Sequence, residues 1–516
     1  MKKRRVRFAP SPTGPLHMGG VRTALYNFLY AHQAGGDFIL RIEDTDSNRF
    51  VPGAEEYIIE ALRWCGIYPD EGVDAEGNVV ETPSERHPYA PYRQSQRRGI
   101  YRKFAEELVE KGWAYYAFDT AEELAALRAE AEAEKRAFTY NQVTRMSLRN
   151  SLTLPKEEVE RMLAEDTNWT IRFKTPVNRI VKMDDLIRGH IEVNSDTLDD
   201  KVLWKRADEL PTYHLANVVD DHLMEITDVI RGEEWLPSLP LHYLLYEAFG
   251  WQDTRPSFAH LSLLLKPDGK GKLSKRDGDR LGFPVFPLRW VNAEGEVSRG
   301  YREDGYYPEA FINLLAMLGW NPGTEQELFT LDELVQAFSL ERVVKSGARF
   351  NPDKAKWFNQ EYLRMRPTEA LIADFRTLNG EKVAAFSDEY IGKVLEMMKE
   401  RAHFANELWD LTAFFFEAPQ TYDESSVAKF WKDEVKEIIP KVREAVKAIE
   451  PFDKETIDAA LHELITSNEW PMGKVMNTLR LFLVGVSKGP GIADMMEIFG
   501  KEEVDRRIGN AIAKLG

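Results

Sequence analysis

The sequence predicts an α/β protein: a Rossmann-type parallel-sheet domain that is interrupted by an inserted α+β domain and followed by an all-α C-terminal region. Three observations support this fold class. Residues 5–42 have the pattern strand, loop, helix, strand, which is that of one βαβ crossover. Residues 116–210 change to a mixture of helical and alternating patterns. From about residue 308 onward the apolar residues recur at helical spacing.

The first crossover unit is defined by residue types along residues 5–42. Residues 6–8 start an apolar strand, and the three prolines and one glycine of residues 10–15 exclude both helix and ladder pairing. A helical pattern begins at Gly20 and ends at the Gly35-Gly36 pair, and residues 38–42 form a second apolar strand.

The loop before this helix is a candidate phosphate site. A helix N-terminus offers unpaired N–H groups and a positive dipole end. His17 stands at the junction, and Gly19-Gly20 allow a ligand to approach the backbone closely. A structural histidine is the alternative for this position when it is considered alone.

Composition sets broad limits on the class of protein. A chain of 516 residues needs several domains, and 43% hydrophobic with 30% charged residues describes a soluble globular protein. The longest apolar runs, such as residues 481–486, are too short to span a bilayer. The basic residues 2–5 are not followed by an apolar segment, so we expect no targeting sequence and a cytoplasmic location.

Cysteine content and charge narrow the possible partners. Cys65 is the only cysteine, which excludes a disulfide framework and a thiolate zinc site. The net charge of -17 argues against a uniformly basic nucleic-acid surface but allows a local basic face.

Polar and amphipathic segments follow in order along the middle of the chain. For Asp44 and Asp46, in the loop after the second strand, we prefer a turn or cap role. Residues 101–111 predict a helix, and the Ala/Glu-rich residues 120–136 predict a solvent-exposed one. Two alternating stretches within the insert, residues 171–174 and 190–193, predict strands.

Residues 211–265 return to a strongly apolar pattern. Residues 211–235 favour strands, followed by a helix at 239–249 and a strand at 258–265. The spacing of His214, Asp221 and His222 matches no known set of metal ligands.

A lysine-rich loop at residues 266–279 is the second candidate for phosphate chemistry. Lys270, Lys272, Lys275 and Arg276 lie on a Gly-rich segment, and mobile ammonium groups can close over developing negative charge. The spacing is not that of a P-loop. A solvated basic loop is the alternative interpretation.

These two loops together resemble the signatures of class I aminoacyl-tRNA synthetases. Pro10-Ser-Pro-Thr-Gly-Pro-Leu-His17-Met-Gly-Gly20 resembles their His-x-Gly-His motif, and Lys272-Leu-Ser-Lys-Arg276 resembles their Lys-Met-Ser-Lys-Ser loop. Further stretches are similar to bacterial-type glutamyl-tRNA synthetases: residues 41–46, 211–222, 229–235, 347–357 and 472–480. The resemblance covers nearly the whole chain.

The resemblance implies five segments. They are a catalytic Rossmann domain in two halves (1–115 and 211–265), an inserted acceptor-stem-binding domain (116–210), a stem-contact domain with the lysine loop (266–349) and a helical anticodon-binding domain (350–516).

The implied reaction joins L-glutamate to tRNA(Glu) through a glutamyl-adenylate, with ATP and Mg2+ as substrate-bound partners, no zinc, no membrane and a monomeric chain. The resemblance makes His17, Lys272 and Lys275 catalytic. It places ATP at His17, Gly19, Gly20, Glu234, Leu264, Lys272, Ser274 and Lys275. It places glutamate at Arg7, Ser11, Glu43, Tyr213, Asn217 and Arg231. Arg7 would bind the side-chain carboxylate, because Arg–carboxylate pairs supply both energy and geometry.

The sequence departs from the family pattern at several positions. Gly20 stands where the class signature has a second histidine, and Leu273 and Arg276 replace Met and Ser of the lysine loop. Ala117 stands near a position where some relatives have a zinc-binding cysteine, which is why we expect no zinc. Residues 282–306 are longer than the usual pattern, and we expect an exposed insertion there.

Four rival functions share part of this evidence. A glutaminyl-tRNA synthetase would have β-barrels where residues 350–516 have helical patterns, and a truncated relative that modifies a tRNA base would lack that region. A silent tRNA-binding or scaffold protein would not need His17, Lys272 and Lys275. A general nucleotidyltransferase would not explain the helical C-terminal region.

Overall fold

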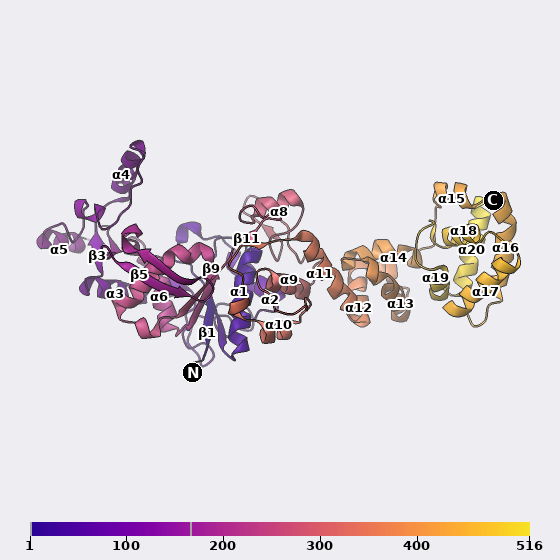
Figure 1. Cartoon of the computed structure of the whole chain (residues 1–516), viewed down its shortest axis with the longest axis horizontal. Coiled ribbons are helices and arrows are strands. Elements are labelled where there is room, and N and C mark those ends of the chain that lie inside the picture. Colours follow the sequence, from indigo (N-terminus) through magenta and orange to yellow (C-terminus); the bar gives the residue numbers. More distant parts are fainter. Residues whose placement is uncertain (1–2, 166–167) are drawn as a thin grey trace. The chain divides into compact units, whose positions relative to one another are not determined.

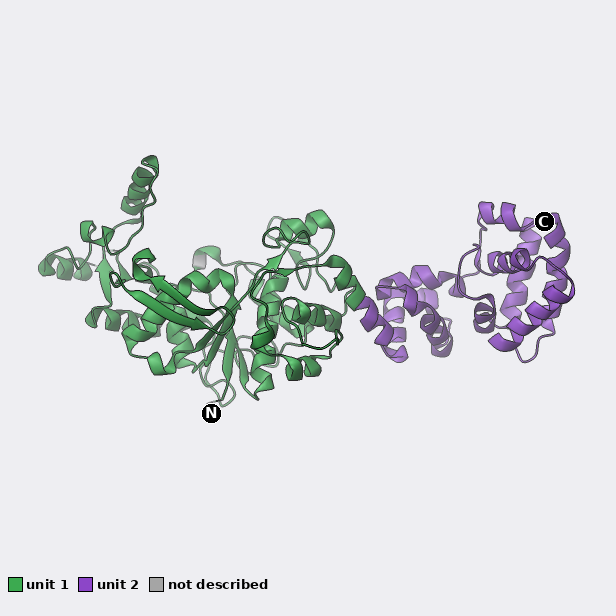
Figure 2. Ribbon diagram, viewed as in Figure 1, with its two compact units in different colours: residues 1–358 green, residues 359–516 purple. Residues whose placement is uncertain are grey.

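The computed structural model, which describes residues 3–165 and 168–516, contains two units, residues 1–358 and 359–516 (Figure 2). The first unit holds both candidate phosphate loops. The second unit is described separately below.

A six-stranded sheet in the order β2-β1-β9-β10-β5-β6 forms the centre of the first unit (Figure 1). Neighbouring strands are parallel except for the antiparallel pair β5–β6. The strands are β1 (Arg5–Phe8), β2 (Asp37–Leu40), β5 (Ile180–Asp185), β6 (Gly189–Asn194), β9 (Asp228–Gly232) and β10 (Ser257–Leu261). Every residue of β1 is buried, so the charges of Arg5 and Arg7 require partners inside the protein.

The predicted strand–loop–helix–strand unit is confirmed, and so is the α/β fold class. Helix α1 (Met18–Gln33) connects β1 to β2, which pair in register Val6 with Phe38. The helix begins two residues before the predicted start at Gly20, which makes His17 its N-cap. Helix α7 (Leu239–Phe249) connects β9 to β10.

The insert contains a second sheet of four antiparallel strands. They are β3 (Ala114–Ala117), β4 (Thr170–Phe173), β7 (Val202–Lys205) and β8 (Leu210–Pro211). Helix α3 (Arg98–Glu110) precedes this sheet, and helices α4 (Ala121–Ala133) and α5 (Lys156–Ala164) lie between its strands in the chain. Only Leu124 and Ala131 of α4 are buried, which confirms the predicted exposed helix.

The hairpin β5–β6 differs from the expected insert because it extends the central sheet. Its strand β5 pairs with β10 in the register Asp185 to Phe258. Alternate residues of β5 are buried, a pattern that fits one covered face of either sheet. Residue alternation therefore predicts the strand but not the sheet to which it belongs.

The strand pattern expected for the beginning of residues 211–235 is wrong, because Tyr213–Leu223 form helix α6. Leu215, Val218 and Val219 are fully buried at helical spacing, and α6 packs against α3 and α7. The β-branched valines favour a strand by propensity, and helical packing overrides that preference. The strand β9 follows at the end of the segment.

The exposed insertion expected at residues 282–306 is also wrong. Phe283, Val285, Phe286, Leu288 and Tyr301 are each at most 8% exposed. The segment packs onto α2 (Ala54–Trp64), where the Tyr57 hydroxyl donates to the Leu288 carbonyl and accepts from the Leu288 N–H. Only the hairpin β12–β13 (Trp290–Val291 and Val297–Ser298) carries mostly exposed residues.

The remaining elements of the first unit lie after residue 262. They are β11 (Leu264–Leu265), α8 (Lys275–Leu281), α9 (Pro308–Met317), α10 (Leu331–Ala337), β14 (Ala348–Arg349) and α11 (Pro352–Met365), which continues into the second unit. Strands β11 and β14 pair in parallel. Along the chain, the lysine loop and the 282–306 segment both lie between these two strands.

The second unit is helical, as predicted. Its helices are α12 (Thr368–Asn379), α13 (Asp388–Met398), α14 (Leu408–Phe416), α15 (Glu424–Phe430), α16 (Asp433–Lys447), α17 (Lys454–Ser467), α18 (Met472–Val484), α19 (Ile492–Phe499) and α20 (Lys501–Leu515). Across residues 3–165 and 168–516, no helix combines the length and apolarity that crossing a membrane would require.

Candidate active site

Two cavities open on the loop between β1 and α1. The smaller, about 330 Å³, is lined by all six residues expected to bind glutamate and also by Gly19, Gly20 and Glu234. The larger, about 750 Å³, is lined by His17, Gly20 and Lys275 among others. The smaller cavity lies where the parallel strands β1, β2 and β9 end, which is the usual ligand edge of such a sheet, and the larger cavity lies beside the loop that follows β1.

Arg7, on β1, is held in the smaller cavity by a buried carboxylate. Its Nε donates to Asp221 Oδ1 at 3.0 Å and Oδ2 at 3.2 Å, and both side chains are at most 3% exposed. Within the described part of the chain, these are the hydrogen bonds that the Arg7 guanidinium makes, so its two terminal nitrogens remain available to a ligand. Burial alone would raise the pKa of Asp221, but the Arg7 and Arg41 guanidinium groups outweigh burial and lower it.

Glu43 lies beside Arg7 and is also buried. Its Oε1 accepts hydrogen bonds from Arg41 Nη2 at 3.0 Å and from Asn217 Nδ2 at 3.3 Å. Burial raises the pKa of Glu43 in spite of the neighbouring Arg41 and Arg7. A further positive charge beside this carboxylate would therefore be favourable.

Arg231, on β9, also lines the smaller cavity and belongs to a chain of buried polar groups. Its Nε donates to His260 Nε2 at 3.0 Å, and its Nη1 donates to the Tyr213 hydroxyl at 2.9 Å. His260 Nδ1 in turn lies 2.6 Å from Asp185 Oδ2. Burial lowers the pKa of His260, so the neutral ring accepts from Arg231 and donates to Asp185.

His17 caps α1 with its own side chain. The Gly19 N–H donates to His17 Nδ1 at 3.2 Å, so the proton of the neutral ring is on Nε2. Burial, assisted by the positive charge of Lys272, lowers the pKa of His17 to about 4. Within the described residues its Nε2 is buried and has no hydrogen-bond partner. A buried donor of this kind is satisfied when a ligand supplies an oxygen.

The first backbone N–H groups of α1 are not free, which corrects the expectation of unpaired donors at this terminus. Met18 N donates to the Val285 carbonyl at 2.9 Å, and Gly19 N is used by His17. An anion in the larger cavity would therefore meet side chains rather than these N–H groups, and His17 and Lys275 are among the side chains that line it.

The lysine loop reaches the larger cavity through one residue. Lys275 lines that cavity at the start of α8, whereas Lys272 and Ser274 are exposed and line neither cavity. Ser274 is the N-cap of α8 and forms a capping box with Asp277, whose carboxylate accepts from the Ser274 N–H and hydroxyl. Leu264 lies beside the first loop, since a Cβ on Gly19 would be 3.7 Å from its Cδ1.

Sequence reasoning missed the residues that hold the predicted site residues in place. Arg41 lies in a family-like stretch but had no role, and Asp221 was weighed only as a metal ligand. The available signals were a charged residue, Arg41, within the apolar run 38–42 and an acidic pair, Asp220-Asp221, three and four residues after Asn217. Asp221 binds arginines, while His214 contacts His242 and His222 stacks on Trp251, so the three do not converge.

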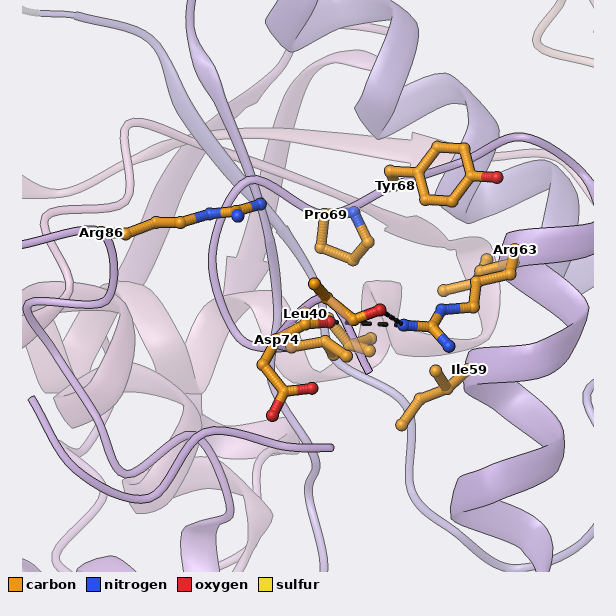
Figure 3. Close-up of a pocket in the computed structure, with 10 residues that line it drawn as sticks. Leu40, Ile59, Arg63, Tyr68, Pro69, Asp74 and Arg86 are labelled. Carbon is orange, nitrogen blue, oxygen red and sulfur yellow. Dashed lines mark hydrogen bonds between the residues drawn. The ribbon is translucent and has the colours of Figure 1, made fainter. Parts of the chain in front are cut away.

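A third cavity, about 360 Å³, lies apart from the predicted residues (Figure 3). It is lined by Ile59, Tyr68 and Arg86 among others. There Arg63 donates to the carbonyl oxygens of Asp74 and Ala75 and holds their loop against α2. These contacts give Arg63 a structural role in this part of the fold.

Comparisons with known proteins find tRNA synthetases as relatives over nearly the whole chain. The family model described as "tRNA synthetases class I (E and Q), catalytic domain" matches residues 3–357, and the model "Anticodon binding domain" matches residues 363–512. The glutamate–tRNA ligase of Porphyromonas gingivalis is 55% identical over 513 residues, which are 99% of each chain. That of Phocaeicola vulgatus is 55% identical over 515 residues, covering 100% of this chain and 99% of the relative.

Solved structures agree as well. A crystal structure of a glutamate–tRNA ligase from Elizabethkingia meningosepticum in complex with its amino acid superimposes with a TM-score of 0.93 at 53% identity, covering 100% of both chains. The glutamate–tRNA synthetase of Elizabethkingia anophelis gives a TM-score of 0.90 at 53% identity, covering 99% of this chain and 100% of that one.

Proposed function

The chain belongs to the class I family of glutamate- and glutamine-specific tRNA synthetases, and from this membership we propose that it attaches L-glutamate to tRNA(Glu). The observation that carries the choice of glutamate is Arg7, a buried guanidinium in the smaller cavity that is paired through Nε only. A cation in this position suits the side-chain carboxylate of glutamate and leaves the neutral amide of glutamine without its charge partner.

The reaction proceeds in two steps that need no nucleophile from the protein. An oxygen of the α-carboxylate of glutamate attacks the α-phosphorus of ATP, the bond from that phosphorus to the oxygen bridging it to the β-phosphorus breaks, and pyrophosphate leaves. A ribose hydroxyl of the terminal tRNA adenosine then attacks the glutamyl carbonyl carbon, and AMP leaves. The chain accelerates both steps by positioning the reactants and stabilising charge.

Glutamate occupies the smaller cavity in this proposal. Its side-chain carboxylate pairs with Arg7, and its α-ammonium lies against Glu43. Burial raises the pKa of Glu43, so a positive charge beside it stabilises its ionised form. The hydroxyl, amide and guanidinium groups that complete the pocket belong to Ser11, Tyr213, Asn217 and Arg231.

ATP spans the smaller and the larger cavity. His17 donates its Nε2 proton to a phosphate oxygen, which satisfies the buried donor. Lys275 neutralises the leaving pyrophosphate, and Lys272 joins it when the loop closes. The remaining ATP contacts of the proposal are Gly19, Gly20, Glu234, Leu264 and Ser274.

Class I synthetases use ATP with Mg2+, and this chain fits a metal that arrives on the nucleotide. Among the residues described, no group of three or more carboxylate, histidine or cysteine side chains could hold a metal ion, so phosphate oxygens would supply most of the ligands. When bound, Mg2+ neutralises phosphate charge. We propose no zinc in this chain.

The helical second unit supports a tRNA partner, since it matches the model described as an anticodon-binding domain. It also disfavours the glutaminyl-specific rival, for which β-barrels are expected there. We propose a monomer that acts in the cytoplasm, where tRNA is charged for translation.

A charging assay tests the proposal. The purified chain is incubated with tRNA(Glu), ATP, Mg2+ and either amino acid, and reactions lacking one component serve as controls. We expect glutamyl-tRNA only when glutamate, ATP and tRNA are all present. Charging with glutamine alone, or with neither amino acid, would refute the assignment.

A further inference from the structure

The 282–306 segment connects the lysine loop to the cap of α1. At one end, Phe283 N donates to the Gly278 carbonyl of α8. The two pack tightly, since a Cβ on Gly278 would lie only 2.8 Å from the Phe283 carbonyl and from Val285 Cγ1. Two residues further on, the Val285 carbonyl accepts the Met18 N–H at 2.9 Å. The segment therefore contacts both loops expected to bind ATP.

Phe286 brings an aromatic ring against His17. The two ring centroids are 5.8 Å apart with an interplanar angle of 81°, an edge-to-face contact. Both residues line the larger cavity, and Phe286 is 7% exposed. This contact places an apolar ring beside the imidazole, and apolar surroundings disfavour the charged form of histidine.

The backbone of Phe286 is held from two sides. Its carbonyl accepts from Tyr301 N at 2.9 Å. Two residues later, Leu288 exchanges two hydrogen bonds with the Tyr57 hydroxyl, at 2.6 and 3.0 Å. Tyr57 lies on α2, so the backbone two residues after Phe286 is attached to an element outside the segment.

We propose that Phe286 is a positioning residue for His17: its ring keeps the imidazole in the orientation in which Nδ1 accepts the Gly19 N–H and the ring lines the larger cavity. The inference rests on the proposed function, because it assigns His17 to ATP. It also gives the 282–306 segment a role beside the reacting groups.

The protonation state of His17 supports this assignment. Protonated Nδ1 would carry an N–H toward the Gly19 N–H and break the cap of α1. Burial of the ring, which Phe286 contributes to, keeps the pKa of His17 at about 4. Removing the Phe286 ring should therefore raise this pKa and loosen the imidazole.

Phe286→Ala tests the proposal against a matched control, Phe283→Ala. Phe283 has nearly the same exposure, 8%, and lies in the same segment, but its ring packs on Phe350 at 4.9 Å. The first readout is the pKa of His17, from NMR titration of its ring C–H signals, assigned by their loss in His17→Gln. The second is kcat and the KM for ATP in aminoacylation.

We expect Phe286→Ala to raise the His17 pKa by about one unit or more toward its ordinary value. We expect kcat to fall about 10- to 100-fold, as for a misplaced catalytic group, with the KM for ATP changed less than about twofold. Phe283→Ala should leave the His17 pKa unchanged. Phe286→Tyr, which keeps an aromatic ring, should retain the native His17 pKa, kcat and KM for ATP.

An unchanged His17 pKa in Phe286→Ala would overturn the proposal, as would equal effects of the two alanine variants. If Phe286→Ala does not fold, Phe286→Leu decides: a smaller upward pKa shift supports the role, and none refutes it. The titration is made without substrates, so a chain that failed to charge glutamate would refute the proposed function and leave this test intact.

Discussion

Asp221→Asn is the most informative single substitution, because it removes the carboxylate that orients Arg7. In the native chain Asp221 accepts from Arg7 Nε at 3.0 and 3.2 Å and from Arg41 Nη1 at 2.8 Å, with all three side chains at most 3% exposed. Asparagine offers one acceptor and turns an amide donor toward a guanidinium. The buried guanidinium groups of Arg7 and Arg41 then share one neutral oxygen acceptor in place of a charged carboxylate.

The size of the effect follows from these contacts. Breaking a buried ion pair at one partner costs about 3–5 kcal/mol, and we expect about 3 kcal/mol because asparagine keeps one acceptor. A loosened Arg7 would lose one charge-assisted hydrogen bond to glutamate, worth about 1.5–3 kcal/mol. At about 1.4 kcal/mol per factor of ten, the KM for glutamate should rise roughly 10- to 150-fold.

The matched control is Asp220→Asn, at the neighbouring and equally buried carboxylate. Asp220 accepts from Arg97, Gln94 and Tyr101 and lies 4.0 Å from Arg41 Nε, a longer ion pair than the one that Arg41 forms with Asp221. Within the described residues, the carboxylate hydrogen-bonded to Arg7 is that of Asp221. Aminoacylation kinetics and urea unfolding are measured for both variants. Both should lose stability, but only Asp221→Asn should lose glutamate affinity. Equal glutamate KM values in the two variants would refute our account of Arg7.

Three further predictions concern Arg7 itself, the lysine loop and pH. Arg7→Ala should lower kcat/KM for glutamate about 100-fold or more while the KM for ATP stays within about twofold, and an unchanged glutamate constant would remove Arg7 from the pocket. Lys275→Ala should lower kcat more than it raises the KM for ATP, since the lysine is proposed to meet charge that develops during reaction; a pure affinity loss would contradict this. The pKa values of His17 and His214 are each lowered to about 4. Between about pH 6.5 and 4 the unfolded chain thus binds more protons, and the free energy of unfolding should fall as pH decreases. Urea unfolding at several pH values should show a shallower fall in His17→Gln and His214→Gln than in the native chain, and identical slopes would contradict these pKa values.

The fold was predictable where local pattern and tertiary environment agree. The β1–α1–β2 unit follows from apolar periodicity and from prolines and glycines at its turns. Helix α6 was not predictable, because its adjacent valines favour a strand locally and only packing against α3 and α7 selects a helix. The membership of β5–β6 in the central sheet depends on a pairing partner that is about 70 residues away in the chain.

The candidate site was predictable in its residue types but not in its supporting contacts. Resemblance named Arg7, and only the structure shows that Asp221, more than 200 residues away, holds it. The same holds for residues 282–306, whose length suggested exposure although Val285 and Phe286 contact the cap of α1. Long-range partners of this kind leave no periodic signal in one sequence.

A competition experiment tests the central claim most directly. The purified chain is given tRNA(Glu), ATP, Mg2+ and equal concentrations of glutamate and glutamine, and the aminoacyl-adenosine released by ribonuclease is identified by mass spectrometry. Our account predicts glutamyl-adenosine alone, because only glutamate supplies a carboxylate to Arg7. Glutaminyl-adenosine as the main product, or no aminoacyl product at all, would contradict it.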